Sequence, residues 1–170
     1  MSCSQILSGI AKDCQPSKGG IRRVLIANYA DVAEIAETQE QVTAITMSEG
    51  ATFKEFIPAR QSSNFTENNQ IDPANGTNFV QTDIALVFNR MDTTKRVELK
   101  ALALNELVVI VEDANGAYWL FGKDEPVMAT AGTGESGTAR TDRNGFTITL
   151  QANDKTLAPE VAAEAIAEIL

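Results

Sequence analysis

The chain has 170 residues and 44% hydrophobic content, which suits one globular domain with its own core. Its 14 basic and 23 acidic residues give a net charge of −9, a balance that disfavours a surface holding nucleic acid through phosphate contacts. Histidine is absent and cysteine occurs twice, which excludes histidine-dependent nucleophiles, zinc sites containing histidine and four-thiolate sites. We therefore predict a protein that is not an enzyme and has no catalytic, cofactor or metal residues.

The first 25 residues are basic, whereas the rest of the chain is acidic. They hold four cations against one anion, a charge of +3, so the remainder carries −12. A basic arm on an acidic body indicates docking, although cations at a terminus are also common without a partner. Gly19-Gly20 ends the arm, which we place at residues 1–20. The interface candidates here are Lys12, Lys18, Arg22 and Arg23.

The start of the chain lacks the apolar core of a signal peptide, and no window approaches the roughly 20 apolar residues of a membrane span. We therefore predict synthesis and retention in the cytosol and no membrane partner. Cys3 and Cys14 are expected to stay free thiols in that reducing compartment, with a disulfide between them as the open alternative.

The main domain, residues 21–155, begins with short β-rich segments. Ile21–Ala27 is an apolar run that predicts a first strand. Asp31–Ala36 offers an N-cap residue and apolar positions at helical spacing, which predicts a short helical turn. Val42–Met47 and Ala51–Ile57 predict the two strands of a hairpin joined by a glycine-containing turn.

Residues 59–78 are rich in Asn, Ser, Gln and Thr and predict a long loop. Structureless segments of this length are uncommon inside compact domains. The segment is therefore either a mobile surface loop or a loop or extended hairpin that a neighbouring subunit orders. Its two large apolar side chains, Phe65 and Ile71, favour the second alternative and are interface candidates.

A long strand and a helix follow this segment. Phe79–Phe88 alternates between apolar and polar residues, which predicts a strand with one buried face. Asp92 is a good N-cap residue, and the helix formers after it predict a helix over residues 92–104. The apolar stripe of this helix consists of Val97, Ala101 and Leu104.

Two turns rich in Asn and Gly organise residues 107–150. Leu107–Val111 and Ala117–Gly122 flank Asn115-Gly116, which predicts a β-hairpin. Asp142–Gly145 leads into Phe146–Leu150, where Asn and Gly again suit the positive φ of a turn. This region predicts an antiparallel sheet.

Three patterns in the same region have a functional and a structural interpretation. Gly132–Gly137 matches the glycine pattern of dinucleotide sites, but a strand follows it where that motif needs a helix, so we expect a flexible hairpin loop. Trp119 and Phe121 share a strand face and are expected to fill the core rather than stack on a ligand. The acidic pairs Glu112-Asp113 and Asp124-Glu125 flank turns, where carboxylates are ordinary.

Residues 156–170 predict a short carboxyl-terminal helix or tail. Pro159 suits a first helical turn, and apolar residues follow it at helical spacing. A helix of about eleven residues is marginal alone, so it needs a surface to lie on. Val161 and Ile169 on its apolar stripe are therefore interface candidates.

Several blocks of turn and strand residues together form a recognisable pattern. They are Tyr118–Pro126, Thr130–Gly134, Asp142–Gly145 and Thr147–Leu150, with Asp13-Cys14, Gly19–Ile21 and Val24–Asn28 near the start. This pattern resembles virion structural proteins of tailed phages that infect Bacteroidetes, of the tail-tube or neck-ring type. The resemblance covers about two thirds of the chain.

The resemblance implies a mainly β fold, an antiparallel β-sandwich or small barrel with one internal helix, an extended amino-terminal arm and a short carboxyl-terminal helix. It also implies a homo-oligomeric ring, with six subunits expected, made in the host cytoplasm and located in the virion tail. The partners would be the chain itself, other phage tail or neck proteins, and DNA that passes through the lumen without specific binding.

Other functions remain as alternatives to a tail-tube subunit. One is a neck or tail-ring protein of a short-tailed phage. Another is a ligand-binding β-sandwich that uses exposed aromatic residues, which requires an exposed Trp119. The last is a hydrolase with two carboxylates converging in a cleft.

Overall fold

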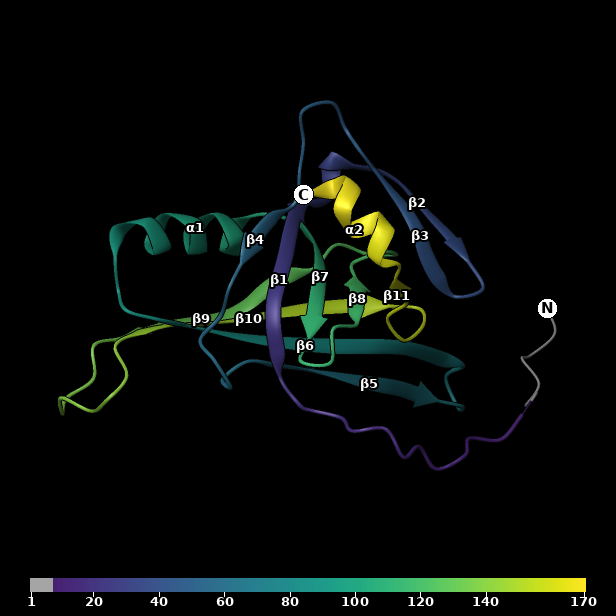
Figure 1. Ribbon diagram of the computed structural model, residues 1–170, viewed down its shortest axis with the longest axis horizontal. Coiled ribbons are helices and arrows are strands. Elements are labelled where there is room, and N and C mark those ends of the chain that lie inside the picture. The colour runs from purple at the N-terminus through teal and green to yellow at the C-terminus, as the bar shows by residue number, and fades with distance from the viewer. Residues whose placement is uncertain (1–7) are drawn as a thin grey trace.

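The computed structural model describes residues 8–170 and confirms the mainly β fold (Figure 1). In this part of the chain, sheet A has the strand order β2-β3-β11-β8-β7-β1-β4, and sheet B has the order β5-β6-β10-β9. Sheet A comprises β1 Ile21–Asn28, β2 Val32–Thr38, β3 Gln41–Met47, β4 Lys54–Phe56, β7 Leu107–Asp113, β8 Tyr118–Phe121 and β11 Glu160–Val161. Sheet B comprises β5 Asn64–Asp72, β6 Thr77–Asn89, β9 Met128–Glu135 and β10 Gly145–Asp154. Both sheets end in edge strands, so of the two predicted architectures the chain adopts the sandwich.

The main core lies between the two sheets. Successive strand residues face opposite sides, so alternate apolar side chains of β1 and β7 meet those of β6 and β10. Val24, Val109, Ile84, Leu86 and Leu150 in this core are fully buried. Sheet B therefore has one face on the core and one face directed away from it.

A second core covers the other face of sheet A. The helix α2, Ala163–Ile169, lies over this face (Figure 1), and Val42 and Ile45 of β3, a strand of the same sheet, also belong to this core. Val108 and Ile110 point into the second core, whereas their neighbours on β7 point into the first. Burial on both faces explains why Leu107–Val111 is apolar at every position.

The predicted internal helix is confirmed as α1, Thr93–Leu104. The Asp92 carboxylate caps it, because Oδ1 accepts a hydrogen bond of 2.8 Å from the Lys95 backbone N–H. Lys95 Nζ also lies 2.8 Å from Asp92 Oδ2. Hydrogen bonds from Lys95 lower the pKa of the Asp92 carboxyl, so the cap is ionised at neutral pH.

The predicted apolar stripe of α1 does not face the core. Val97, Ala101 and Leu104 are exposed, whereas Leu102 is buried and Leu99 is half-buried. The helix lies beside one end of the sandwich (Figure 1) and touches it along the Leu99–Leu102 side. The stripe is therefore a solvent-facing surface of the isolated chain.

The segment Asp31–Ala36 is not the predicted helical turn. Only Tyr29–Asp31, labelled η1, is helical, and it is a 3-10 turn; the strand β2 starts at Val32 and pairs with β3. The turn between these strands is Gln39-Glu40, with φ of 52° and 62°. Positive φ at both positions is the geometry of a tight hairpin turn. Asn and Gly are typical of such turns, whereas Gln and Glu are not, so the sequence does not predict this turn.

The predicted hairpin between Val42–Met47 and Ala51–Ile57 is also wrong. β3 pairs with β2 and β11, whereas β4 pairs with β1, where Val24 lies opposite Phe56. The intervening segment crosses sheet A, and Phe53 fills the second core on the way. Burial of Phe53 in the second core therefore replaces a hairpin between these two segments.

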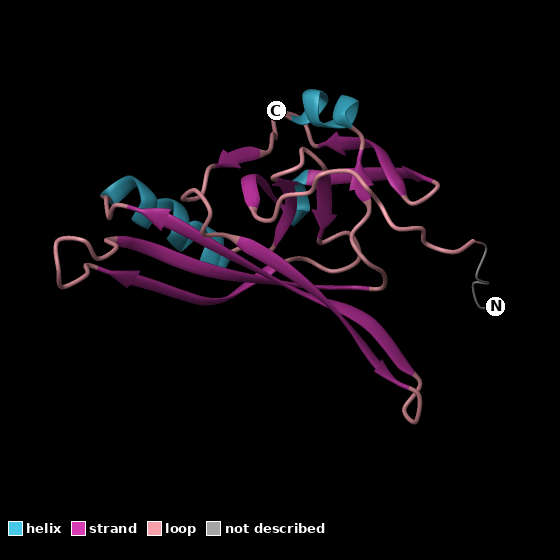
Figure 2. Cartoon of the chain, turned by 60° about the horizontal axis from the view of Figure 1, so that its bottom comes forward, coloured by secondary structure: helices cyan, strands magenta, loops and turns pink. Residues whose placement is uncertain are grey.

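Residues 59–78 are largely strand, so the long-loop prediction is corrected to its hairpin alternative. Asn64–Asp72 forms β5, which pairs with β6 up to the register Asp72 opposite Thr77. The Asp72 carboxylate holds the turn, accepting hydrogen bonds from the backbone N–H groups of Ala74 and Asn75. Figure 2 shows this hairpin projecting beyond the body of the sandwich.

The hairpin predicted from Leu107–Gly122 is confirmed. β7 and β8 pair with Val109 opposite Phe121, and Gly116 in their turn has φ of 89°.

The loop predicted at Gly132–Gly137 is wrong, because β9 continues to Glu135, and the positive φ of the second turn falls on Gly137 rather than on Asn144 or Gly145. β9 and β10 also pair antiparallel, with Gly145 opposite Glu135. An added Cβ at Gly145 would lie 2.1 Å from the Phe88 carbonyl oxygen, so close approach of strands requires glycine there.

The carboxyl-terminal helix is shorter than predicted. Glu160-Val161 forms β11, which adds to sheet A beside Gln41-Val42 and Trp119. The helix α2 begins only at Ala163. Pro159 predicts that the helix begins at residue 159. Glu160-Val161 instead pairs with β3 and β8, and this pairing delays the start of the helix.

The described part of the arm, residues 8–20, is exposed and extends away from β1 (Figure 1). Its end is held at Lys18, whose backbone exchanges hydrogen bonds of 2.8 and 2.9 Å with the side chain of Asn115. Cys14 is exposed, and Cys3 lies outside the described residues. Of the described helices, none has the length and apolar composition needed to span a membrane.

Candidate assembly surfaces

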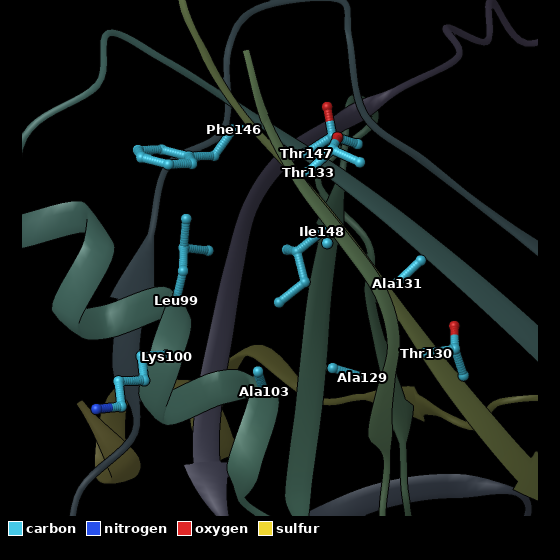
Figure 3. Close-up of a pocket in the computed structure, with 12 residues that line it drawn as sticks. Leu99, Lys100, Ala103, Ala129, Thr130, Ala131, Thr133, Phe146, Thr147 and Ile148 are labelled. Atoms are coloured by element: carbon cyan, nitrogen blue, oxygen red, sulfur yellow. The ribbon is translucent and has the colours of Figure 1, made fainter.

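A groove of about 430 Å³ separates α1 from β9 and β10 (Figure 3). Leu99 and Ala103 of α1 face Phe146 and Ile148 across it, whereas Thr133 and Thr147 point away from the helix. Lys100 is its one titratable lining residue, and the ammonium group points away from the other labelled side chains (Figure 3). The groove therefore offers hydroxyl and apolar groups rather than an acid and a base. Within residues 8–170, no three His, Cys, Asp or Glu side chains are arranged to hold a metal ion.

The two carboxylates whose pKa is raised have structural partners. Burial raises the pKa of Asp154, although this carboxylate accepts hydrogen bonds from the backbone N–H groups of Gly122 and Asp124. Burial also raises the pKa of Glu67, which accepts a 2.7 Å hydrogen bond from the Ala158 N–H. Together they fix two loops, β8–β9 and β10–β11, at one end of the sandwich.

Arg22 and Arg23, predicted as interface residues, form ion pairs inside the chain. The Arg23 guanidinium binds the Glu112 and Glu55 carboxylates and donates a 2.9 Å hydrogen bond to the Tyr118 hydroxyl. Arg22 binds the other oxygen of Glu112 at 3.1 Å. The prediction is corrected for Arg23, which is half-buried; Arg22 remains exposed.

Three apolar interface candidates are also used within the chain. Phe65 packs edge-to-face on Phe121 with ring centroids 5.2 Å apart. Val161 and Ile169 are buried in the second core. Val161 is part of sheet A, and Ile169 packs on that sheet from α2. Both side chains are covered by the same chain and are not available to a neighbouring subunit.

The remaining candidates lie on the surface. Lys12 and Lys18 are exposed in the arm, and Ile71 is 63% exposed on the projecting hairpin. Trp119, the residue that would carry aromatic ligand binding, is half-buried against the core, and its Nε1–H donates to Asp113.

The outer face of sheet B is a surface that the sequence analysis missed. Its side chains alternate with the core-facing ones along each strand, and most carry hydroxyl or amide groups. They include Thr66 and Asn68 on β5, Gln81 and Asp83 on β6, Ala131 and Thr133 on β9, and Thr147, Thr149, Gln151 and Asn153 on β10. Asp83 accepts a hydrogen bond from Gln151, and at the end of β9 the outward Glu135 forms an ion pair with Arg143, which also donates to the Thr147 hydroxyl, so the charges on this face are few and partly paired. The signal was present in β10, where Thr, Thr, Gln and Asn alternate with buried residues.

The chain matches no protein-family model, no curated protein and no solved structure.

Proposed function

We propose that this protein is a structural subunit that assembles with copies of itself into stacked rings, forming a phage tail tube through which DNA passes. The observation that carries the proposal is sheet B, which combines two unpaired edges with a polar outer face that carries few charges. The sequence resemblance supplies the biological setting, and the fold class that it implies agrees with the sandwich.

The two edges of sheet B are suited to pairing with each other. β5 has nine residues and β9 has eight, and neither contains the Lys or Pro residues that commonly protect an exposed edge. The strands alternate in direction across the sheet, so β5 and β9 run in opposite directions. β5 lies level with Thr77–Ala85 of β6 and β9 with Asp83–Asn89, so identical copies that are also shifted along the strands pair β9 with the next β5 in the same antiparallel pattern. Such a head-to-tail contact closes into a ring when the rotation between copies allows it.

The outer face of sheet B supports the role of lumen wall. In a ring closed through β5 and β9, one face of sheet B packs on the core and the other lines the channel. Hydroxyl and amide side chains give DNA phosphates little electrostatic attraction, and the overall charge of −9 opposes retention further. DNA then passes without being held.

Trp119 bears on the rival function of ligand binding through aromatic residues. The Trp119 ring is packed on the core and hydrogen-bonded, and the neighbouring Tyr118 ring is covered by the Arg23 guanidinium, 5.8 Å from its centroid. Both rings therefore have intramolecular partners. This favours the structural role over an aromatic binding platform.

Assembly can be tested with purified protein by mass photometry and negative-stain microscopy. Rings or tubes are expected, and a strict monomer at high concentration would reject the proposal. Thr66→Lys on β5 and Thr133→Lys on β9 should each block ring closure, because a charged edge resists strand pairing. Thr46→Lys on the exposed part of β3 is the matched control and should assemble normally. Single rings that never stack would instead favour the neck-ring alternative.

A further inference from the structure

We propose that copies join end to end through the projecting β5–β6 hairpin of one copy and the exposed stripe of α1 on the next. This inference rests on the proposed function and names the contact by which one ring stacks on another. The two surfaces lie at opposite ends of the molecule in both views (Figures 1 and 2). The strands of sheet B follow that long axis, so the free edges of the sheet, β5 and β9, run along the sides of the molecule and not at these two ends.

The α1 surface is apolar and has no cover in the described chain. Val97 is 61% exposed and Leu104 is 76% exposed, with exposed Ala101 between them on the same stripe. Each is a position where apolar surface remains in water, and burial in a contact would be favourable. One side of the helix packs on the sandwich and the other presents this stripe.

The hairpin lacks support at its end. β10 pairs with β6 only as far as Asp154 opposite Val80, so residues 70–79 form a two-stranded projection without a third strand. An isolated two-stranded hairpin is marginal in water. Ile71 and Phe79, on opposite faces of the projection, are 63% and 38% exposed. A partner surface would therefore both bury these side chains and stabilise the hairpin.

The charges at the two ends are complementary. Residues 90–104, which include α1, hold four cations and two anions although the whole chain is acidic. The hairpin end is acidic on balance: Glu67, Asp72, Asp124, Glu125 and Asp154 lie on the hairpin or at its base, against the cations Lys123 and Lys155. End-to-end contact thus brings opposite charges together, and it is directional because the two ends differ.

Two segments of a second copy could cover the α1 stripe, the amino-terminal arm or the β5–β6 hairpin, and their charges distinguish them. The described arm carries Lys12 and Lys18 against Asp13, so its charge has the same sign as that of α1. The hairpin has the opposite sign and a large exposed apolar side chain on each face. The occupant proposed is accordingly the hairpin of a second copy, not its arm.

Cysteine cross-linking tests the contact directly. In full-length chains carrying Cys3→Ser and Cys14→Ser, one variant adds Ile71→Cys and a second adds Val97→Cys. A short bis-maleimide should link the two variants when they are mixed under assembly conditions. In the control mixture, Thr46→Cys takes the place of Val97→Cys. This mixture should give no more cross-linked dimer than either of its two variants gives alone. Equal yields from the two mixtures would overturn the inference.

Charged substitutions separate this contact from ring formation. Val97→Asp combined with Leu104→Asp should leave single rings intact and reduce the stacked fraction more than tenfold, as should Ile71→Asp. Thr46→Asp, at an exposed position of β3 away from both surfaces, is the matched control. If rings form and these variants still stack, the end-to-end contact is wrong while the proposed function stands; if wild-type protein forms no rings, the proposed function itself fails. Loss of stacking on deletion of residues 1–20, with normal stacking of Ile71→Asp, would assign the stripe to the arm.

Discussion

Arg23 and Glu112 lie directly opposite each other on β1 and β7, and a charge-assisted hydrogen bond joins their side chains. Glu112 is buried, with only 5% of its side chain exposed, and a second cation, Arg22, binds its other carboxylate oxygen. The pair lies at the end of β1 where the arm meets sheet A. It fixes the point from which the arm leaves the body.

Glu112→Gln should destabilise the fold by about 2 kcal/mol, because it removes a buried carboxylate that two guanidinium groups share and leaves Arg23 with the more exposed Glu55 as its ion-pair partner. Glu55→Gln removes a more exposed partner of the same Arg23 and should cost less than about 1 kcal/mol. Urea unfolding followed by circular dichroism measures both changes. Similar losses in the two variants would contradict the special role of Glu112.

Gly145→Ala should destabilise the fold by about 3 kcal/mol, because the added methyl group would collide with the Phe88 carbonyl oxygen across the β6–β10 ladder. Gly132→Ala on the neighbouring strand is the matched control. Its Cβ would meet nothing closer than 3.9 Å, so a change within about 0.5 kcal/mol is expected. Thermal unfolding of both variants provides the measurement, and equal midpoints would refute the packing argument.

The raised pKa of Asp154 predicts a pH effect of definite sign. A carboxyl whose pKa is raised on folding binds its proton more tightly in the folded state, so its ionisation opposes folding. As pH falls through the raised pKa toward the ordinary value of 3.8, wild-type protein should gain stability relative to Asp154→Asn. Urea unfolding of both proteins at pH 7 and at pH values approaching 4 tests the sign. A difference that stays constant or moves the opposite way would contradict it.

Local patterns predicted the elements with strong chemical signals. Asp92 gave the start of α1, and Asn115-Gly116 gave the β7–β8 turn, because each residue type performs its function within a few residues of chain. The β2–β3 turn was missed because Gln39 and Glu40 adopt positive φ without the usual residues. Its geometry depends on strand pairing that short windows do not contain.

Placement of apolar surfaces was harder to predict than the elements themselves. Val161 and Ile169 form an apolar pattern, but the pattern does not say whether the surface that covers them belongs to the same chain. Conversely, Val97 and Leu104 match a buried helix face and are exposed, because α1 touches the sandwich through Leu99 and Leu102. Periodicity identifies an apolar face, and only the tertiary arrangement assigns its partner.

The candidate lumen wall depended on sheet pairing in the same way. Thr149 and Gln151 read as ordinary solvent-facing residues of one strand. They can be recognised as part of a continuous polar surface only when β5, β6, β9 and β10 are placed side by side in one sheet. The strand order β5-β6-β10-β9 joins segments far apart in the sequence, so composition alone did not reveal it.

In the proposed ring, Thr149→Lys together with Gln151→Lys should make the channel retain DNA. The two cations would face phosphates along the outer face of sheet B, and their contribution should weaken steeply with salt. Assembled rings of the variant should bind double-stranded DNA in a filter-retention assay at low salt, whereas wild-type rings should not. Thr46→Lys together with Thr43→Lys, on exposed positions of β3, adds the same charge away from the lumen wall. Equal DNA retention by both double variants would show that net charge, rather than position in the channel, controls binding.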